Sequence, residues 1–303
     1  MLTAFTNRYR AMKRFWTVLL LCAVSSLAWA GGNALAVRKQ VELSMLLSGN
    51  IVVEKDGTVG SYTVDQREKI PPGVLQLLES NVPKWQFEPV LVDGQPVRAR
   101  AKMGLRIVAQ QAGDDKYNLR IDSSSFGDAE ENARKKSVTS PKLDPPHYPQ
   151  AAARAGVTGT VFLVLKVGRD GTVQDLLVEQ VNLTVLGTEG HMRWGRDLLS
   201  RAASAAAKKW TFNVPTHGED VNRESWNIRV PVDFVLSDGP MRSGSEYAKW
   251  KAYVPGPRSI APWIDEAERA ANFKPDAMLA GQVYTEGSGL RLLTRPTTDV
   301  EPL

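Results

Sequence analysis

Cysteine and histidine are scarce in this sequence. Among 303 residues the only cysteine is Cys22, in an apolar run near the N-terminus, so a chain that loses this run has no thiol for a disulfide or a thiolate metal site. His147, His191 and His217 are too far apart in sequence to suggest metal ligation. A phosphate-binding glycine loop and a Gly-x-Ser-x-Gly elbow are also missing. We therefore expect no enzyme activity, no cofactor and no metal.

Long blocks of one charge are missing as well. The chain has 38 Lys and Arg against 33 Asp and Glu, a net charge of +5, and these residues are mixed along its length. No stripe of basic residues alternates with stacking aromatics, so we expect no nucleic-acid partner. Hydrophobic residues make up 43% of the chain and charged residues 23%, as in an ordinary globular protein. The length predicts about two domains.

Residues 1–30 have the three parts of a secretory signal peptide. A basic segment precedes the apolar residues 15–24, and Ala-Trp-Ala at 28–30 is a cleavage signal; a second one lies at 34–36. The alternative is an uncleaved anchor facing the periplasm from the inner membrane. Residues 15–30 are short for that role, because a spanning helix needs about 20 residues. We expect cleavage and a periplasmic protein.

Two segments of the chain share the same order of features. Each has an Asp-Gly turn after an apolar-rich strand, then Trp-x-Phe, then an alternating apolar run. The residues are Asp56, Gly57, Trp85 and Phe87 in the first segment, and Asp170, Gly171, Trp210 and Phe212 in the second. We interpret this as an old duplication whose first copy has drifted. At these positions the two tryptophans are expected in the core.

The pattern of each segment predicts strand, strand, helix, strand. In the second segment, apolar residues alternate over 161–167, Asp-Gly predicts a hairpin, and residues 173–181 return as a strand. Residues 197–207 are rich in Ala and Leu and predict a helix, and residues 227–236 form a last strand. The predicted fold class is α+β, with two small units, each a sheet packed on one or two helices.

The same patterns divide the chain. We expect a first unit at 37–122, with a helix at 72–81, a last strand at 97–109, and a turn at 113–115 into a further strand at 117–121. A polar linker follows at 123–144, then the second unit at 145–237. Residues 238–303 form a Pro- and Gly-rich extension with one short helix at 263–273 and a loose end from residue 286.

The second segment resembles the C-terminal domain of the energy transducer TonB. Six features of that family occur in order over about ninety residues. They are Pro-x-Tyr-Pro ending at Tyr148 and Pro149, an Ala-rich turn ending at Gly156, Gly-Thr-Val at 159–161, the Asp170-Gly171 hairpin, Trp210-x-Phe212 after an Ala-rich helix, and Val-Pro-Val-x-Phe-x-Leu at 230–236. The first segment shares only the hairpin, the Trp-x-Phe and the last strand.

The resemblance implies a partner-binding domain. In this family a short segment of an outer-membrane transporter adds to an edge strand, and force from a proton-driven inner-membrane motor passes along the chain. An edge strand offers unpaired N–H and C=O groups to an extended peptide. We expect that edge, with the Tyr148-Pro149 lead-in near it, at Asn227, Ile228, Arg229, Val230, Pro231, Val232, Asp233 and Phe234. Pro231 lacks a donor and so indicates an edge or a bulge.

Three functions remain open. The first is a periplasmic protein that binds an outer-membrane transporter or another envelope protein. The second is a membrane-anchored energy transducer that contacts the motor complex, although residues 15–36 lack the family's membrane His and the linker is much shorter than the family's Pro-rich spacer. The third is a structural envelope module that binds itself, as a homodimer for example, or the cell wall.

Overall fold

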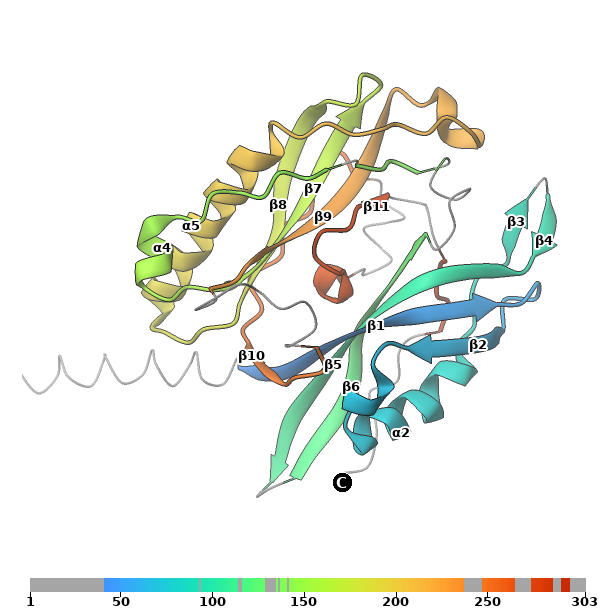
Figure 1. The fold of residues 1–303 in the computed structure, drawn as a ribbon, viewed down its shortest axis with the longest axis horizontal. Coiled ribbons are helices and arrows are strands. Elements are labelled where there is room, and N and C mark those ends of the chain that lie inside the picture. The colour runs from blue at the N-terminus through green and yellow to red at the C-terminus, as the bar shows by residue number, and fades with distance from the viewer. Residues whose placement is uncertain are drawn as a thin grey trace, which may run out of the picture.

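The computed structural model describes residues 41–92, 94–113, 116–128, 135, 137–140, 142–236, 247–264, 274–285 and 290–294. The expected signal peptide, residues 114–115 of the expected turn, and residues 265–273 of the expected C-terminal helix lie outside this part; residues 263–264 of that helix lie in a turn or bend. The described chain forms two large antiparallel sheets, each covered by a helix, and a separate two-stranded hairpin (Figure 1). The α+β class is therefore confirmed.

The first unit is built on five strands. They are Glu42–Val53 (β1), Val59–Val64 (β2), Ala99–Gly113 (β5), Lys116–Asp128 (β6) and Lys251–Tyr253 (β10). Their order is β10-β1-β5-β6, and β2 also pairs with β1. Pro72–Asn81 (α2) lies at the predicted place and begins with proline, which suits the first helical position because its missing N–H has no partner there. Two 3₁₀ turns, Arg67–Lys69 and Val82–Lys84, and the hairpin Val90–Val92 (β3) with Gln95–Val97 (β4) complete the unit.

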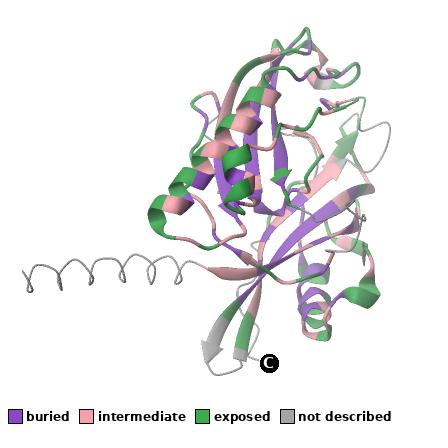
Figure 2. Ribbon diagram, turned by 60° about the vertical axis from the view of Figure 1, so that its left-hand side comes forward, coloured by how far each residue is buried: buried purple, intermediate pink, exposed green. Residues whose placement is uncertain are grey.

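The second unit has four strands and two helices. The strands are Gly159–Gly168 (β7), Val173–Leu183 (β8), Ser225–Phe234 (β9) and Tyr284–Thr285 (β11), in the order β11-β9-β7-β8. The helices are Gln150–Arg154 (α4) and Glu189–Ala207 (α5), and 3₁₀ turns lie at Glu219–Asn222 and, in the C-terminal extension, at Pro275–Ala277. In both units the buried residues gather in the strands and on the inner side of the helix (Figure 2).

Helix α5 begins at Glu189, earlier than the predicted residue 197. Thr188 caps it, because its side chain accepts a hydrogen bond from the backbone N–H of His191 at 3.3 Å. Gly195 is a weak helix former, but it lies so close to Val157 that an added Cβ would be 2.9 Å from a methyl carbon. Close packing therefore keeps a glycine inside this helix. Helix propensity alone predicts a start at residue 197, which leaves Gly195 out.

The Asp-Gly turn and the Trp-x-Phe are hydrogen bonded to each other in both units. The backbone N–H of Phe87 donates to the carbonyl of Gly57 at 2.8 Å, and that of Phe212 to Gly171 at 2.9 Å. Both glycines have a positive φ, 85° and 75°. A Cβ on Gly57 would lie 2.1 Å from the carbonyl oxygen of Phe87, and one on Gly171 2.2 Å from that of Phe212. The two motifs recur together because the segment that follows the helix hydrogen bonds to the hairpin turn in each unit.

The aspartates of these turns are also equivalent. Asp56 accepts from the N–H and hydroxyl of Thr58 at 3.0 and 2.7 Å. Asp170 accepts from the N–H and hydroxyl of Thr172 at 3.0 and 2.8 Å. These bonds favour the charged carboxylate and lower the pKa of both aspartates. The Asp-Gly-Thr sequence thus specifies the turn through its side chains as well as through glycine.

The linker and the C-terminal extension differ from the prediction. Residues 123–128 belong to β6, and Val138, inside the expected linker, is buried in the core of the second unit. The described part of the extension adds β10 to the first sheet and β11 to the second, and Leu292 bridges Phe87. A Pro- and Gly-rich composition without periodicity indicates loops, yet here the edges of two folded sheets supply hydrogen-bonding partners to the extension.

Candidate functional site

Strand β9 is the last of the three long strands in the second sheet. It pairs with β7 from Ser225 opposite Gly168 to Phe234 opposite Gly159, without a register shift. The residues on the face toward α5 are buried, namely Ile228, Val230, Val232 and Phe234. A strand therefore lies at nearly the predicted place, and the exposed Val235 and Leu236 follow it; in the sheet it stands between β7 and β11.

Pro231 shows which way the backbone of β9 faces. Its carbonyl accepts a hydrogen bond from the backbone N–H of Gly281 at 3.4 Å, on the side away from β7. The N and O of one residue point to the same side of a strand, so the missing donor of Pro231 also faces outward. Pro231 therefore lies at no bulge, and the β7 ladder is undisturbed, because its donor-free side faces away from β7.

The outer side of β9 is partly occupied by β11. Tyr284 lies opposite Arg229 and Thr285 opposite Ile228. The hydroxyl of Thr285 accepts from the N–H of Val138 at 3.0 Å. Two residues are too few to show alternation, so nothing in the sequence pattern indicates this strand. Asn227 and Asp233 lie on either side of the paired residues, and Asp233 accepts from the hydroxyl of Thr160 at 2.6 Å.

The predicted lead-in lies at one end of β9. The ring of Tyr148 packs edge-on against Phe234, with centroids 5.4 Å apart. Its hydroxyl donates to the carbonyl of Val157 at 2.6 Å, and burial raises the pKa of this tyrosine. Pro149 precedes the first residue of α4. The Tyr-Pro pair therefore lies where the chain enters α4, beside the Phe234 end of β9.

The tryptophans and phenylalanines of the repeated motif belong to the two cores. Trp85 and Trp210 are 2% and 5% exposed. Trp210 donates from Nε1 to the carbonyl of Asp144 at 2.8 Å. Trp85 and Phe87 pack edge-on with Phe126, at 6.0 and 5.0 Å between ring centroids. Both positions are core positions, as the sequence indicates.

A buried ion-pair group lies on the face of the second sheet away from α5. Glu179 of β8 is 1% exposed; it accepts from Nε of Arg229 at 2.8 Å and from Nη2 of Arg258 at 2.8 Å. The N–H of Ser259 also donates to the carbonyl of Glu179 at 2.8 Å. This group fastens the extension across the sheet. Sequence reasoning missed it, because three single charges so far apart along the chain show no pattern.

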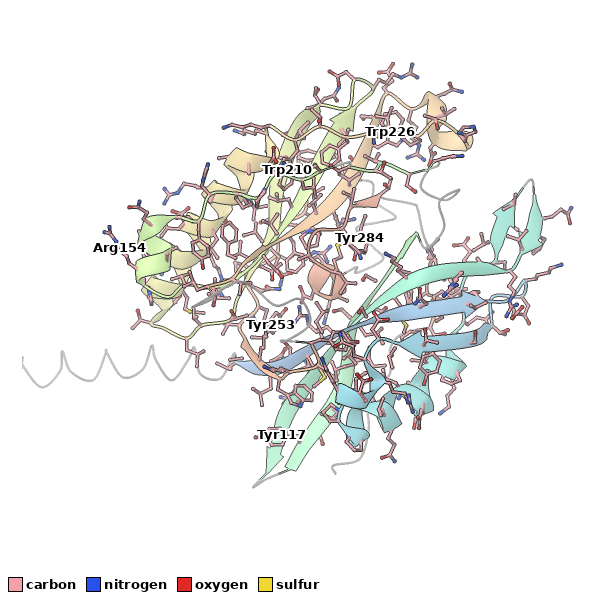
Figure 3. All side chains as sticks on the ribbon, viewed as in Figure 1. Tyr117, Arg154, Trp210, Trp226, Tyr253 and Tyr284 are labelled. Carbon is pink, nitrogen blue, oxygen red and sulfur yellow. The ribbon has the colours of Figure 1, made fainter. Side chains whose placement is uncertain are left out.

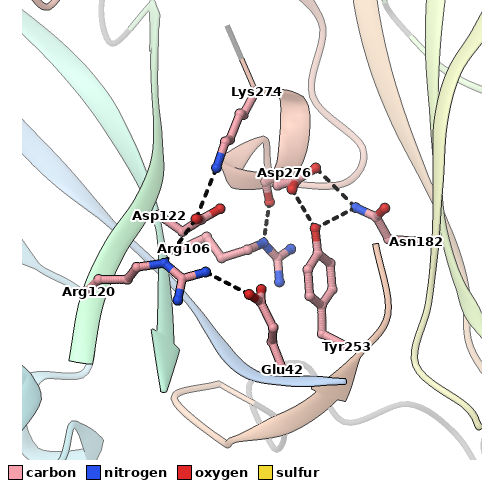
Figure 4. Close-up of polar contacts among 8 residues, drawn as sticks. All are labelled: Glu42, Arg106, Arg120, Asp122, Asn182, Tyr253, Lys274 and Asp276. Atoms are coloured by element: carbon pink, nitrogen blue, oxygen red, sulfur yellow. Dashed lines mark hydrogen bonds and ion pairs between the residues drawn. The ribbon is translucent and has the colours of Figure 1, made fainter. Parts of the chain in front are cut away.

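A second polar group joins the two units (Figure 4). Arg106 of β5 donates to the carbonyl of Asp276 at 2.7 Å and to the hydroxyl of Ser44 at 2.8 Å, and its guanidinium lies 4.6 Å from the ring centre of Tyr253. The hydroxyl of Tyr253 donates to the carboxylate of Asp276. Asn182 of β8 donates to both, at 3.0 Å each. The extension therefore bridges β5 and β8 through a buried, hydrogen-bonded group.

Burial and the neighbouring charge of Asp276 raise the pKa of Tyr253 far above its ordinary value. Beside this group, Asp122 accepts from Lys274 at 3.0 Å and from Arg120 at 3.2 Å, and Arg120 also pairs with Glu42 at 2.7 Å. Tyr253 and Tyr284 both lie between the two sheets (Figure 3). We call this contact between the two units the seam. It is structural, because its polar groups pair with one another.

Two further findings concern the described residues. Among them, no three His, Cys, Asp or Glu side chains are grouped closely enough to hold a metal ion. No helix in the described ranges is both long enough and apolar enough to span a bilayer.

Comparison with known proteins gives a family match in this same unit and relatives of similar sequence. Residues 144–182 match the family described as Gram-negative bacterial TonB protein C-terminal. Protein TonB of Xanthomonas campestris pv. campestris (strain B100) is 39% identical over 101 residues, which cover 33% of this chain and 39% of that protein. Protein tonB2 of Pseudomonas aeruginosa is 34% identical over 92 residues, which cover 30% of this chain and 29% of that protein. No solved structure matches the chain.

The chain thus spans about two fifths of the length of the Xanthomonas relative and less of the Pseudomonas one. The matched family region begins at the lead-in and runs through β7 into β8. The matches confirm the resemblance that the sequence motifs indicate: the second unit of this chain carries a domain of the TonB C-terminal family.

Proposed function

We propose that this chain is a periplasmic, non-enzymatic binding protein that takes up an extended segment of an outer-membrane transporter, or of another envelope protein, along the outer side of β9. The observation that carries the proposal is the position of β9. The second unit resembles the TonB C-terminal family in sequence, and β9 lies at one side of its three long strands. The side of Pro231 that lacks a donor faces away from β7. Strand addition needs such an edge.

Main-chain pairing would supply most of the binding energy. Strand β9 is ten residues long, and alternate residues such as Asn227, Arg229 and Asp233 present their backbone groups on the outer side. Each main-chain hydrogen bond contributes about 0.5–1.5 kcal/mol net. Side chains near the ends of the strand, including the Tyr148–Phe234 pair, would then select among peptides.

In this proposal the first unit binds no partner strand, because its equivalent of β9 is already paired on the outer side. Its strand equivalent to β9 is β5, which β6 covers from Ala101 opposite Asp128 to Gly113 opposite Lys116. The shared element order and the matching turn bonds support a duplication. Only the second unit would keep an edge for a partner.

A membrane-anchored energy transducer is the second candidate. The names of the two relatives, Protein TonB and Protein tonB2, favour it. The two candidates differ in the fate of residues 15–36, which lie outside the described part. Fractionation of a Gram-negative host expressing the full chain, followed by intact-mass measurement, separates them. A soluble product starting at Gly31 or Val37 supports the periplasmic binding protein, and a membrane-bound product retaining residue 15 supports the transducer.

Peptide binding tests the proposed edge. Synthetic N-terminal segments of transporters from the same bacterium would be titrated against the full chain and against Asn227→Pro, which removes one outward donor as Pro231 already does. We expect about 2- to 10-fold weaker binding by Asn227→Pro, the effect of one hydrogen bond. Peptides carrying proline at alternate positions are the matched control. The proposal fails if no peptide binds while circular dichroism shows an intact fold.

A further inference from the structure

The C-terminal extension occupies part of the edge that the proposed function requires. Strand β11 lies on the outer side of β9, in the place where a partner strand would add. We propose that β11 is an internal stand-in for the partner strand, so that an incoming segment binds by displacing it. This inference rests on the proposed function for the identity of the partner, but not for the existence of the displaceable strand.

The main-chain pairing between β11 and β9 is short. Tyr284 and Thr285 pair with Arg229 and Ile228, and the N–H of Gly281 reaches the carbonyl of Pro231 at 3.4 Å, a long hydrogen bond. The hydroxyl of Thr285 also contacts both backbone groups of Val138, at 3.0 and 3.4 Å. The pairing therefore covers only two of the ten residues of β9.

The first unit provides the contrast. There the hairpin partner β6 covers β5 through twelve residue pairs, and the two strands are joined directly in sequence. A partner peptide would have to remove a long, continuous ladder to reach β5. At β9 a peptide of six or more residues would form more main-chain pairs than the two it displaces. The edge of the second unit is thus accessible by exchange, and that of the first is not.

Both flanks of β11 are held elsewhere. Before it, the carbonyl of Asp276 accepts from Arg106 at 2.7 Å and that of Ala277 from Ser125 at 2.8 Å. After it, the N–H of Leu293 donates to the carbonyl of Gln86 at 2.8 Å. Strand β11 can therefore leave β9 while these flanking contacts stay in place. Because it remains tethered, it competes with any partner at a high effective concentration.

The stand-in also indicates what kind of segment the edge accepts. Thr285 places a hydroxyl on the backbone of Val138, and the ring of Tyr284 lies against Gly127, where an added Cβ would be 3.6 Å from Cε1. Tyr284 further accepts from the N–H of Leu279 at 2.8 Å. A matching partner is an extended segment that runs antiparallel to β9 and carries an aromatic residue followed by a hydroxyl residue.

Two substitutions weaken β11 by independent means. Thr285→Ala removes the hydroxyl contacts to Val138. Gly281→Ala strains the turn before β11, since Gly281 has a φ of 76°, while the added Cβ would meet no atom within 4 Å. The matched controls are Thr294→Ala, whose hydroxyl accepts from the N–H of Gln86, and Gly94→Ala, whose φ is 74° with no atom within 4 Å.

The probe is a fluorescent peptide with the chain's own sequence at 279–285, Leu-Ala-Gly-Gln-Val-Tyr-Thr, titrated by anisotropy against each full-length variant. A strand that covers the edge most of the time lowers the apparent affinity in proportion to the uncovered fraction. We expect Thr285→Ala and Gly281→Ala to bind the peptide roughly tenfold or more tightly than wild type, with both controls like wild type. Equal affinity in all five proteins, or no binding by any of them, overturns the inference.

Transporter peptides measured on the same proteins separate this inference from the proposed function. In one outcome the 279–285 peptide binds the weakened variants more tightly and no transporter peptide binds. This outcome supports the displaceable strand and refutes the transporter as partner. In the other outcome transporter peptides bind wild type and both weakened variants with equal affinity. This outcome supports the proposed function and refutes the displaceable strand.

Discussion

The backbone N–H of Phe212 donates to the carbonyl oxygen of Gly171 across 2.9 Å. This bond joins the segment just after α5 to the hairpin between β7 and β8, and Phe87 makes the same bond to Gly57 in the first unit. The hairpin turn is therefore part of the tertiary packing, and its glycine has a role that no other residue type can fill without strain.

Gly171→Ala should destabilise the fold strongly. Gly171 has a φ of 75°, and its Cβ would be 2.2 Å from the carbonyl oxygen of Phe212. A left-handed conformation costs a non-glycine residue about 1–3 kcal/mol, and the clash adds to that cost. Gly156→Ala is the control, with a φ of 66° and no atom within 4 Å of the added carbon. Urea unfolding measures both, and equal losses would contradict the role of the Phe212 carbonyl.

Glu179→Gln should destabilise the second unit by roughly 3–5 kcal/mol, the usual cost of breaking a buried ion pair, since Arg229 is left with its charge buried. Glu189→Gln is the matched control. Its carboxylate is 3.9 Å from Arg193 on the surface of α5, where an ion pair contributes about 0–1 kcal/mol. Thermal and urea unfolding compare the two, and a similarly small effect at both positions would contradict the prediction.

Tyr253→Phe should loosen the seam between the two units. The substitution removes the hydroxyl that donates to Asp276 and accepts from Asn182, at a cost of about 1–3 kcal/mol for the buried groups left without it. Tyr117→Phe, at a tyrosine 39% exposed on β6, should change stability very little. Hydrogen exchange then shows where the loss lies: we expect faster exchange in β10 and near Asn182, and exchange limited to other regions would refute the assignment.

The same tyrosine predicts a loss of stability in alkali. Burial raises the pKa of Tyr253 in the folded chain above its ordinary value of 10.0. The folded state therefore holds this proton more tightly than the unfolded state. The resulting stabilisation is fully present below pH 10.0, and it declines as the pH rises above that value. Tyr253→Phe should show a shallower decline than wild type between about pH 10 and 11 in urea unfolding, and parallel curves would contradict the prediction.

The sequence by itself determined the repeated unit. Gly57 and Gly171 require a positive φ, alternation specifies the strands, and Pro72 with its following leucines marks α2 at its observed bounds. These are local signals, set by backbone sterics and by the period of each element. The TonB C-terminal resemblance depends on the same signals, which is why sequence alone was enough to find it.

Only the tertiary structure decided what covers the edges. Strands β10 and β11 are three and two residues long and have no pattern of their own; they are strands because β1 and β9 offer them hydrogen bonds. The groups around Glu179 and Asp276 likewise join charges from distant segments that become neighbours only in the folded chain. Hydrogen-bonding partners distant in sequence leave no local trace, so the occupied state of β9 could not be predicted from the sequence.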